Sequence, residues 1–197
     1  MLDAQPGSRT AASDPPRVAS VALEDMQLTF GTHLCAFYQT AEGRLKLGVP
    51  FLVSGLRDGD ACFVVASPTA TRALREGLLD PALGGLQAQE LDDLTLHPGS
   101  ADPLAMLDWF HGAFMRESAR GRKCRVLGDM ACFLEAGASI DAVLAFESRY
   151  DQGLARQFAV LSLCQYDSRA FSGVEVVAAL RCHADTFEYP LARFLGP

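Results

Sequence analysis

Short, almost continuously apolar runs alternate along the chain with longer segments in which apolar residues recur at helical spacing. The runs of strand length span residues 33–38, 61–67, 94–97, 123–130 and 158–167. Runs that are apolar at successive positions are typical of strands buried on both faces of a sheet. We therefore predict five strands, each followed by a helix.

Helix signals follow each of these runs. After the first run, Thr40 is a candidate N-cap, and the side chains that recur on one helical face are Leu45, Val49, Leu52 and Leu56. Ser67-Pro68 and Asp102-Pro103 each pair a capping residue with a proline at the first helical position. A later helix carries an apolar stripe at Ile140, Val143, Phe146, Tyr150 and Leu154, and Ser172 with Glu175 forms a capping-box pattern.

Strands that alternate with helices favour a mostly parallel sheet covered on both faces, because parallel neighbours need crossover connections. We predict an α/β fold, a three-layer sandwich around a mostly parallel central sheet. Residues 1–20 are rich in Ala, Ser, Pro and Asp and predict a disordered N-terminal tail, so the single domain is expected over residues 21–197. Ligands of such sheets usually bind where the carboxyl ends of the strands meet the loops.

Composition narrows the function. The net charge is −7 and the pI is near 5.0, so direct binding to nucleic acid is disfavoured. We expect no membrane association and a cytoplasmic location, because no apolar stretch approaches the length of about 20 residues that spans a bilayer. The six cysteines show no CxxC spacing and are expected to be reduced thiols.

A phosphate site is not indicated after the first strand. The segment YQTAEGRL at residues 38–45 stands where a nucleotide-binding protein would carry the GxxxxGK[ST] loop, known as Walker A, and that motif is missing. Asp129 ends another apolar run, where a carboxylate could hold Mg²⁺ if a phosphate cradle were present. Without one, Asp129 either caps a loop or helix end or orients a ligand.

Histidine and cysteine suggest two further kinds of chemistry. His33 and Cys35 lie two apart and share one face of a strand, and Cys164 or His183 could complete four N/S metal ligands. HxC alone is a weak metal signal. Cys164 could instead be a nucleophile with His183 or His33 as base and Asp129 or Asp167 as the orienting acid, but nothing in the spacing selects this.

The residues Cys164-Gln165-Tyr166-Asp167 end the longest apolar run and combine a thiol, an amide, a phenol and a carboxylate. Small-ligand pockets have mostly apolar walls and a few placed polar groups, and Tyr38, Tyr166 and Trp109 could supply the walls. The alternative is that the tyrosine and aspartate only fix the strand-to-helix turn.

The segments GTHLCAFYQTAEGRL, GVPFLVSGLRDGDACFVVA, RVLGDM and LCQYDSRAF, with a late histidine, resemble the MEDS domain, a sensory domain named from methanogens and methylotrophs. The resemblance covers about residues 24–190 and is carried above all by HxCxFY and CxYD. It implies a fold related to RecA-like ATPases of the KaiC type that has lost the phosphate-binding loop. Such domains are input modules of signalling proteins and are proposed to sense hydrocarbon derivatives.

The resemblance also implies a set of sensory-site residues. The motif positions are His33, Cys35, Tyr38, Asp129, Cys164, Tyr166 and Asp167, and Met130 and His183 join the candidate ligand-binding set. The family usually has Glu at the position of Asp129, an aromatic residue shortly after Met130, and Pro after the late histidine, where this chain has Ala184. These departures predict a different ligand or a degenerate site.

We therefore predict a non-catalytic sensor that binds a small, hydrocarbon-like ligand and regulates transcription or a partner such as a histidine kinase or an anti-sigma-factor system. No catalytic residue, metal or cofactor is expected, and a homodimer is plausible. The alternatives are a redox or metal sensor that uses the histidines and cysteines, and a degenerate nucleotide-binding protein.

Overall fold

The structure, a computed structural model, describes residues 18–20, 27–188, 190 and 194–195. Its strands are β1 (Val18–Ser20), β2 (Gln27–Thr29), β3 (His33–Tyr38), β4 (Ala61–Val65), β5 (Leu94–His97), β6 (Cys124–Asp129) and β7 (Val160–Asp167). Its α-helices are α1 (Ala41–Arg57), α2 (Pro68–Leu79), α3 (Met106–Ala119), α4 (Ala131–Glu135), α5 (Ile140–Tyr150) and α6 (Gly173–Cys182).

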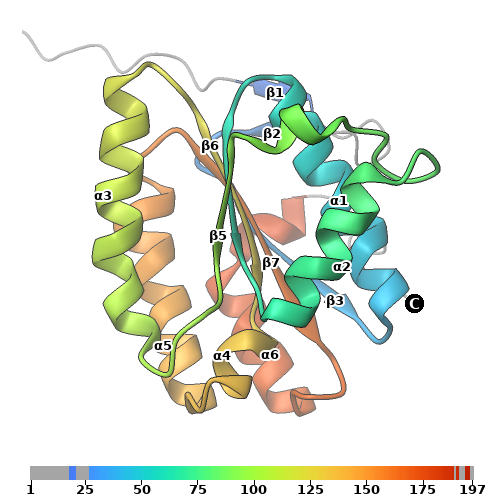
Figure 1. Cartoon of the computed structure of the whole chain (residues 1–197). Coiled ribbons are helices and arrows are strands. Elements are labelled where there is room, and N and C mark those ends of the chain that lie inside the picture. The colour runs from blue at the N-terminus through green and yellow to red at the C-terminus, as the bar shows by residue number, and fades with distance from the viewer. Residues whose placement is uncertain (1–17, 21–26, 189, 191–193, 196–197) are drawn as a thin grey trace, which may run out of the picture.

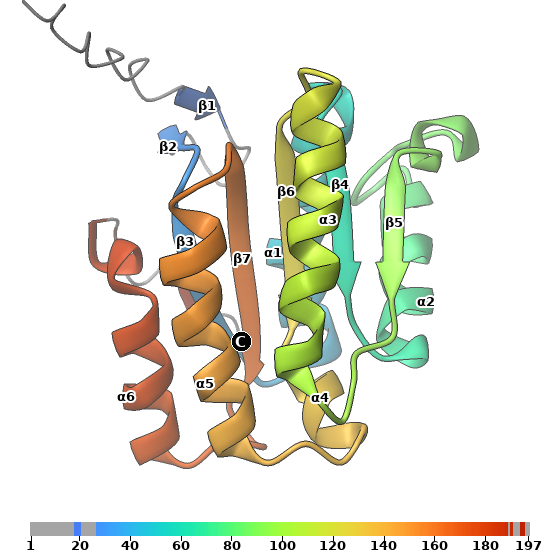
Figure 2. The same cartoon turned by 90° about the vertical axis from the view of Figure 1, so that its left-hand side faces the viewer.

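Five strands form one parallel sheet in the order β3-β7-β6-β4-β5. Helices α3, α5 and α6 cover one face of this sheet, and α1 and α2 cover the other, as Figure 1 shows from the side and Figure 2 shows with α3, α5 and α6 in front. The predicted fold class, a three-layer α/β sandwich with a parallel central sheet, is confirmed.

Side chains of successive residues alternate between two hydrophobic cores. Phe63, Val126 and Cys164 point into the core under α3, α5 and α6. Val64 and Leu127, the next residues along β4 and β6, point into the core under α1 and α2. This alternation is the ordinary consequence of the strand period of two, and it decides which polar residues can meet.

The helix boundaries follow the predicted capping residues. The side chains of Thr40, Ser67 and Ser172 each accept a hydrogen bond from a backbone N–H of the first turn that they precede. The predicted helix with the stripe from Ile140 to Leu154 is different at its end, because α5 stops at Tyr150 and continues as one π-helical turn over Asp151–Ala155. That irregular turn lies beside the buried cluster described below.

Strand β3 is an edge of the sheet, and its outer backbone groups are satisfied by side chains from the chain end. The N–H groups of His33 and Cys35 donate to Asp185 Oδ2 at 2.8 Å and Thr186 Oγ1 at 3.0 Å. Both acceptors belong to the 3₁₀ turn Ala184–Glu188, which directly follows α6 and His183. Covering the edge in this way protects it from pairing with another strand and fixes His183 against β3.

The structure describes only the last three residues of the predicted N-terminal tail. Residues 1–17, most of the predicted tail, lie outside the described residues. Val18–Ser20, at the end of the range assigned to the tail, form β1 and pair antiparallel with β2. At the other end of the chain, Leu195 forms a parallel bridge to Phe37 of β3.

A fully buried arginine fixes the core under α1. Arg125 Nε donates to Asp60 Oδ2 at 2.8 Å, and Arg125 Nη1 donates to the Phe51 carbonyl at 3.2 Å. The guanidinium passes so close to Gly55 of α1 that a Cβ there would lie 2.5 Å from Arg125 Cδ. Glycine at this helical position is therefore required by the packing of the arginine.

We expect Gly55→Ala to lower the free energy of unfolding by about 1–3 kcal/mol, because the pinned arginine cannot move aside. The matched variant is Gly112→Ala in α3, where a Cβ would meet only Arg116 Nη1 at 3.5 Å. That variant should gain about 0.5–1 kcal/mol, the ordinary preference of a helix for alanine over glycine. Urea denaturation of both variants measures the difference, and equal effects would contradict the packing argument.

Candidate functional site

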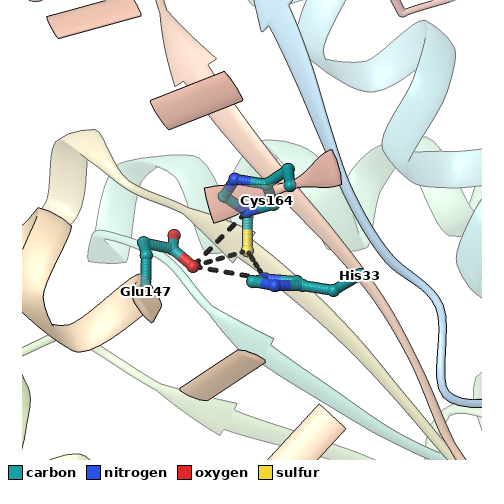
Figure 3. Close-up of side chains that lie close together, drawn as sticks. His33, Glu147 and Cys164 are labelled. Carbon is teal, nitrogen blue, oxygen red and sulfur yellow. Dashed lines mark hydrogen bonds and ion pairs between the residues drawn. The ribbon is translucent and has the colours of Figure 1, made fainter. Parts of the chain in front are cut away.

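Four titratable side chains meet in the core between the sheet and helices α5 and α6. They are His33 at the start of β3, Glu147 of α5, Cys164 in the middle of β7 and His183 at the end of α6. None of the four is more than 3% exposed. Figure 3 shows His33 and Cys164 facing the Glu147 carboxylate across the gap between sheet and helix. We call these four residues the buried cluster.

The Glu147 Oε2 atom is the centre of the buried cluster. It lies 3.2 Å from His33 Nε2 and 3.4 Å from His183 Nε2. The Cys164 Sγ donates to the same oxygen at 3.6 Å and lies 3.3 Å from His33 Nε2. The other carboxylate oxygen, Oε1, accepts a hydrogen bond from the Tyr166 hydroxyl at 2.9 Å. One carboxylate therefore joins two strands and two helices.

Proximity shifts the protonation of these groups in different directions. Burial opposes ionisation of Glu147, but the two neighbouring imidazoles lower its pKa well below the usual range. Burial also opposes a charge on His33, yet its contacts with Asp151 and Glu147 leave its pKa raised. Burial and the adjacent His33 lower the pKa of His183. The arrangement is that of a His33–Glu147 ion pair beside a neutral His183.

Each imidazole also has an oxygen at its other nitrogen. His183 Nδ1 lies 2.7 Å from the Ala179 carbonyl, to which it can only donate. His33 Nδ1 lies 3.4 Å from Asp151 Oδ1, at an angle outside hydrogen-bond geometry. Asp151 opens the π-helical turn after α5 and is itself paired with Arg156 at 3.2 Å. π-Helical turns are frequent at functional sites.

A small apolar cavity of about 10 Å³ adjoins the buried cluster. It lies between the sheet and helices α3 to α5, and Cys164 belongs to both the cavity wall and the cluster. The Tyr150 hydroxyl, the other polar group of the wall, is bonded to Ser162 Oγ at 2.8 Å. The lining residues are Val65, Phe110, Val126, Gly128, Met130, Phe133, Phe146, Tyr150 and Cys164.

A second polar group lies on the opposite face of the sheet. Asp129 Oδ1 accepts from the Tyr38 hydroxyl at 2.8 Å, and Asp129 Oδ2 accepts from Arg44 Nη1 at 3.1 Å. The Gln165 side chain donates to the Arg44 carbonyl at 2.9 Å. Burial raises the pKa of Asp129 although Tyr38 and Arg44 oppose that shift. Asp129 also accepts from the Ala131 N–H, as the capping alternative predicted.

The predicted site residues therefore do not lie together in one site but in separate parts of the domain. His33, Cys164 and His183 come together, with Tyr166 bonded to their glutamate and Met130 on the cavity wall. Tyr38 and Asp129 lie on the other face of the sheet. Asp167 pairs with the exposed Arg169 at 2.6 Å. Cys35 lies next to Thr186 and is not one of the four residues whose donor atoms converge.

Glu147 is the residue that sequence reasoning missed. A signal for it exists, because Glu147 follows Val143 by four positions and precedes Tyr150 by three, within the apolar stripe of α5. A charged residue inside such a stripe is buried with the stripe and must find partners there. The acids proposed from the sequence to orient a histidine, Asp129 and Asp167, are not the ones that contact it.

The geometry does not favour Cys164 as a nucleophile. Burial and the negative charge of Glu147 raise the pKa of the Cys164 thiol, so the reactive thiolate is disfavoured. All six cysteines are unpaired, and burial raises the pKa of Cys35 and Cys62 to about 12.

The fold and the site define an α/β domain whose polar centre lies beneath its helices and which lacks a phosphate-binding loop. A family model described as the methanogen/methylotroph, DcmR sensory domain (MEDS) matches residues 32–184. The chain therefore belongs to the MEDS family of sensory domains.

Two similar proteins extend the comparison. The chain is 33% identical over 190 residues to the transcriptional repressor DcmR of Methylorubrum extorquens, covering 88% of this chain and 66% of that protein's length. The chain also resembles a solved structure of the pCW3 conjugation coupling protein TcpA, in its monomer form with ATPγS, at 11% identity and a TM-score of 0.46. That likeness covers 83% of this chain and 52% of the other. The relation to DcmR supports a role in regulation.

Within the part of the chain that the structure describes, no helix has both the length and the apolar character needed to cross a bilayer.

Replacing Tyr166 by phenylalanine should leave Glu147 Oε1 buried without a donor and lower the free energy of unfolding by about 1–3 kcal/mol. Tyr38→Phe is the matched change on the other face, where Asp129 Oδ1 keeps the Ala131 N–H, and it should cost less than about 1.5 kcal/mol. Chemical denaturation at neutral pH measures both. An unchanged Tyr166→Phe protein would show that this hydroxyl contributes nothing to holding Glu147.

Proposed function

We propose that the chain is a non-catalytic ligand-binding sensor, and that the apolar cavity next to the buried cluster is where a small hydrocarbon-like molecule binds. The observation that carries this proposal is the composition of the cavity wall, in which apolar side chains adjoin one thiol and one satisfied phenol. A wall of this kind favours apolar or weakly polar ligands, because a charged molecule would lose its hydration without gaining a partner.

The size of the cavity sets a condition on binding. About 10 Å³ holds no more than one water-sized molecule, so a larger ligand requires a wall residue to move. Met130 is the side chain best able to do so, because methionine is unbranched and adapts its shape. Its methyl group lies over Gly128, where a Cβ would be 2.4 Å from Met130 Cε. Glycine at this position leaves the space into which the methionine folds.

Ligand entry would act on the rest of the domain through Phe146 and Tyr150 of α5, which line the cavity, and through the cluster residue Cys164. A ligand that fits one arrangement of these residues better than another shifts the population between them. Such a shift would move α5 relative to the sheet and alter the surface to which a partner protein binds.

The relation to DcmR supports a proposal for the output of this sensor. DcmR is a transcriptional repressor, and this chain spans 66% of its length. We infer that the domain controls transcription through a partner protein, for which a histidine kinase or an anti-sigma-factor system remains the expected kind, and that it works in the cytoplasm without direct contact with nucleic acid. A homodimer would place two sensors on one regulator.

Adding one methylene group to a side chain that lines the cavity makes the cavity smaller and tests the proposal. Val126→Ile fills part of the cavity, whereas Val64→Ile adds the same group at the other face of the sheet. Titration of the purified chain with n-pentane, benzene and 1-butanol, followed by thermal denaturation, should show stabilisation by at least one probe. Val126→Ile should weaken that response roughly tenfold or more.

The control Val64→Ile should respond as the unaltered protein does. A response that Val126→Ile and Val64→Ile reduce equally would place the ligand elsewhere. The absence of any response in the unaltered protein would argue against an apolar ligand.

A further inference from the structure

The four residues of the buried cluster are arranged around a common point. His33, Glu147, Cys164 and His183 each offer one donor atom, and these four atoms all lie within 4.8 Å of one another. They come from β3, α5, β7 and α6, so no two of them are neighbours in the sequence. This arrangement goes beyond what the ligand cavity explains, because only Cys164 lies on the cavity wall.

The separations of the donor atoms fit a four-coordinate metal ion. Bond lengths of about 2.0–2.3 Å to nitrogen, oxygen and sulfur place tetrahedral ligand atoms about 3.3–3.6 Å apart. His33 Nε2 lies 3.2 Å from Glu147 Oε2 and 3.3 Å from Cys164 Sγ. Glu147 Oε2 lies 3.4 Å from His183 Nε2 and 3.6 Å from Cys164 Sγ. The two remaining separations, from His183 Nε2 to the donor atoms of His33 and Cys164, are no longer than 4.8 Å.

A polar atom without a partner points into the same space. His183 Nδ1 donates to the Ala179 carbonyl, which leaves Nε2 as the nitrogen that faces the cluster. This Nε2 is buried and makes no hydrogen bond, although Glu147 Oε2 lies 3.4 Å away. In the neutral imidazole a lone pair therefore faces a carboxylate oxygen, and two acceptors gain nothing from each other. A cation between them would satisfy both.

The surroundings of His183 and Glu147 match those of metal ligands. A metal-bound histidine generally directs its other ring nitrogen at a backbone carbonyl or a carboxylate, which fixes the ring. His183 Nδ1 donates to the Ala179 carbonyl. The other carboxylate oxygen of Glu147 accepts from the Tyr166 hydroxyl. Both residues thus have an outer partner that orients them, and the Asp151 carboxylate lies 3.4 Å from His33 Nδ1 without making a hydrogen bond.

We propose that His33, Glu147, Cys164 and His183 form a binding site for one divalent transition-metal ion, of which zinc suits this mixed nitrogen, oxygen and sulfur set best. Binding would form a metal–sulfur bond and a metal–nitrogen bond in place of the S–H bond of Cys164 and the Nε2–H bond of the His33 imidazolium, and both protons would leave to solvent. The two anionic ligands then balance the ion's charge. All four positions are filled by buried side chains, so the ion has a regulatory or structural role rather than a catalytic one.

The chain offers a closely matched control. Cys35 and Cys164 are direct partners in the register of β3 and β7, both are buried, and both face the same core. Only Cys164 belongs to the cluster of donor atoms. Cys164→Ser should therefore impair metal binding, whereas Cys35→Ser should leave it intact.

The test uses the full chain purified without chelators or an affinity tag that binds metal. Elemental analysis should find about one zinc per chain, or another divalent transition metal in its place. After removal of the metal, titration with Co²⁺ should produce the absorption of four-coordinate cobalt together with a thiolate-to-cobalt charge-transfer band. Cys164→Ser should lose the charge-transfer band, and Cys35→Ser should keep it.

A second readout does not depend on these variants. Zinc added to the metal-free chain should raise its melting temperature, since an ion that binds only the folded state stabilises it. Tyr166→Phe should weaken zinc binding about 10–100-fold through the loss of its hydrogen bond to Glu147. These readouts are independent of pentane, benzene or butanol, so the metal site and the apolar-ligand proposal can fail separately.

Two results would overturn the metal site. One is a protein that is purified without metal and takes up neither Zn²⁺ nor Co²⁺ at one ion per chain. The other is a cobalt spectrum in the unaltered protein without thiolate charge transfer, or one that Cys35→Ser abolishes and Cys164→Ser retains. Should Cys164→Ser fail to fold, the spectrum of the unaltered protein and of Cys35→Ser decides between the two cysteines.

Discussion

A carboxylate without access to water organises this domain. An unpaired ionised carboxylate in a protein interior is unfavourable by several kcal/mol, so the chain must supply donors from every side. Glu147 obtains them from Tyr166, Cys164 and His33. Because these partners belong to β7 and β3, the position of α5 over the sheet is set by polar contacts as well as by apolar packing. At the sheet edge, backbone N–H groups of β3 donate to Asp185 and Thr186 and so hold β3 against the turn that follows His183.

The two faces of the sheet differ in their buried charges. Under α1 and α2, Arg44 pairs with Asp129 and Arg125 is buried against Asp60. The unsatisfied Nε2 atom of His183 and the apolar cavity lie on the other face, beneath α3, α5 and α6. Parallel sheets usually place ligands at the carboxyl ends of strands, but His33 stands at the beginning of β3.

The cavity and the buried cluster adjoin each other at one shared residue. Cys164 belongs to both, and Tyr150, on the cavity wall, immediately precedes the π-helical turn that begins with Asp151. A molecule in the cavity and an ion in the cluster would therefore act on the same end of α5. Membership of the MEDS family and the relation to DcmR agree with a domain that senses and reports.

The sequence by itself determined the strands, the helix caps and the missing phosphate loop, because apolar runs, Thr40 or Ser172, and GxxxxGK[ST] are local signals. The sequence also implied that the predicted site residues lie on both faces of the sheet. His33 and Tyr38 are five residues apart in one strand, and the alternation of side chains along a strand puts them on opposite faces. Only the tertiary structure decided that β3 lies beside β7, and that Glu147 and His183 close over this pair. Strand order and helix placement arise from packing between distant segments, and no local pattern records which distant residues will share one buried charge.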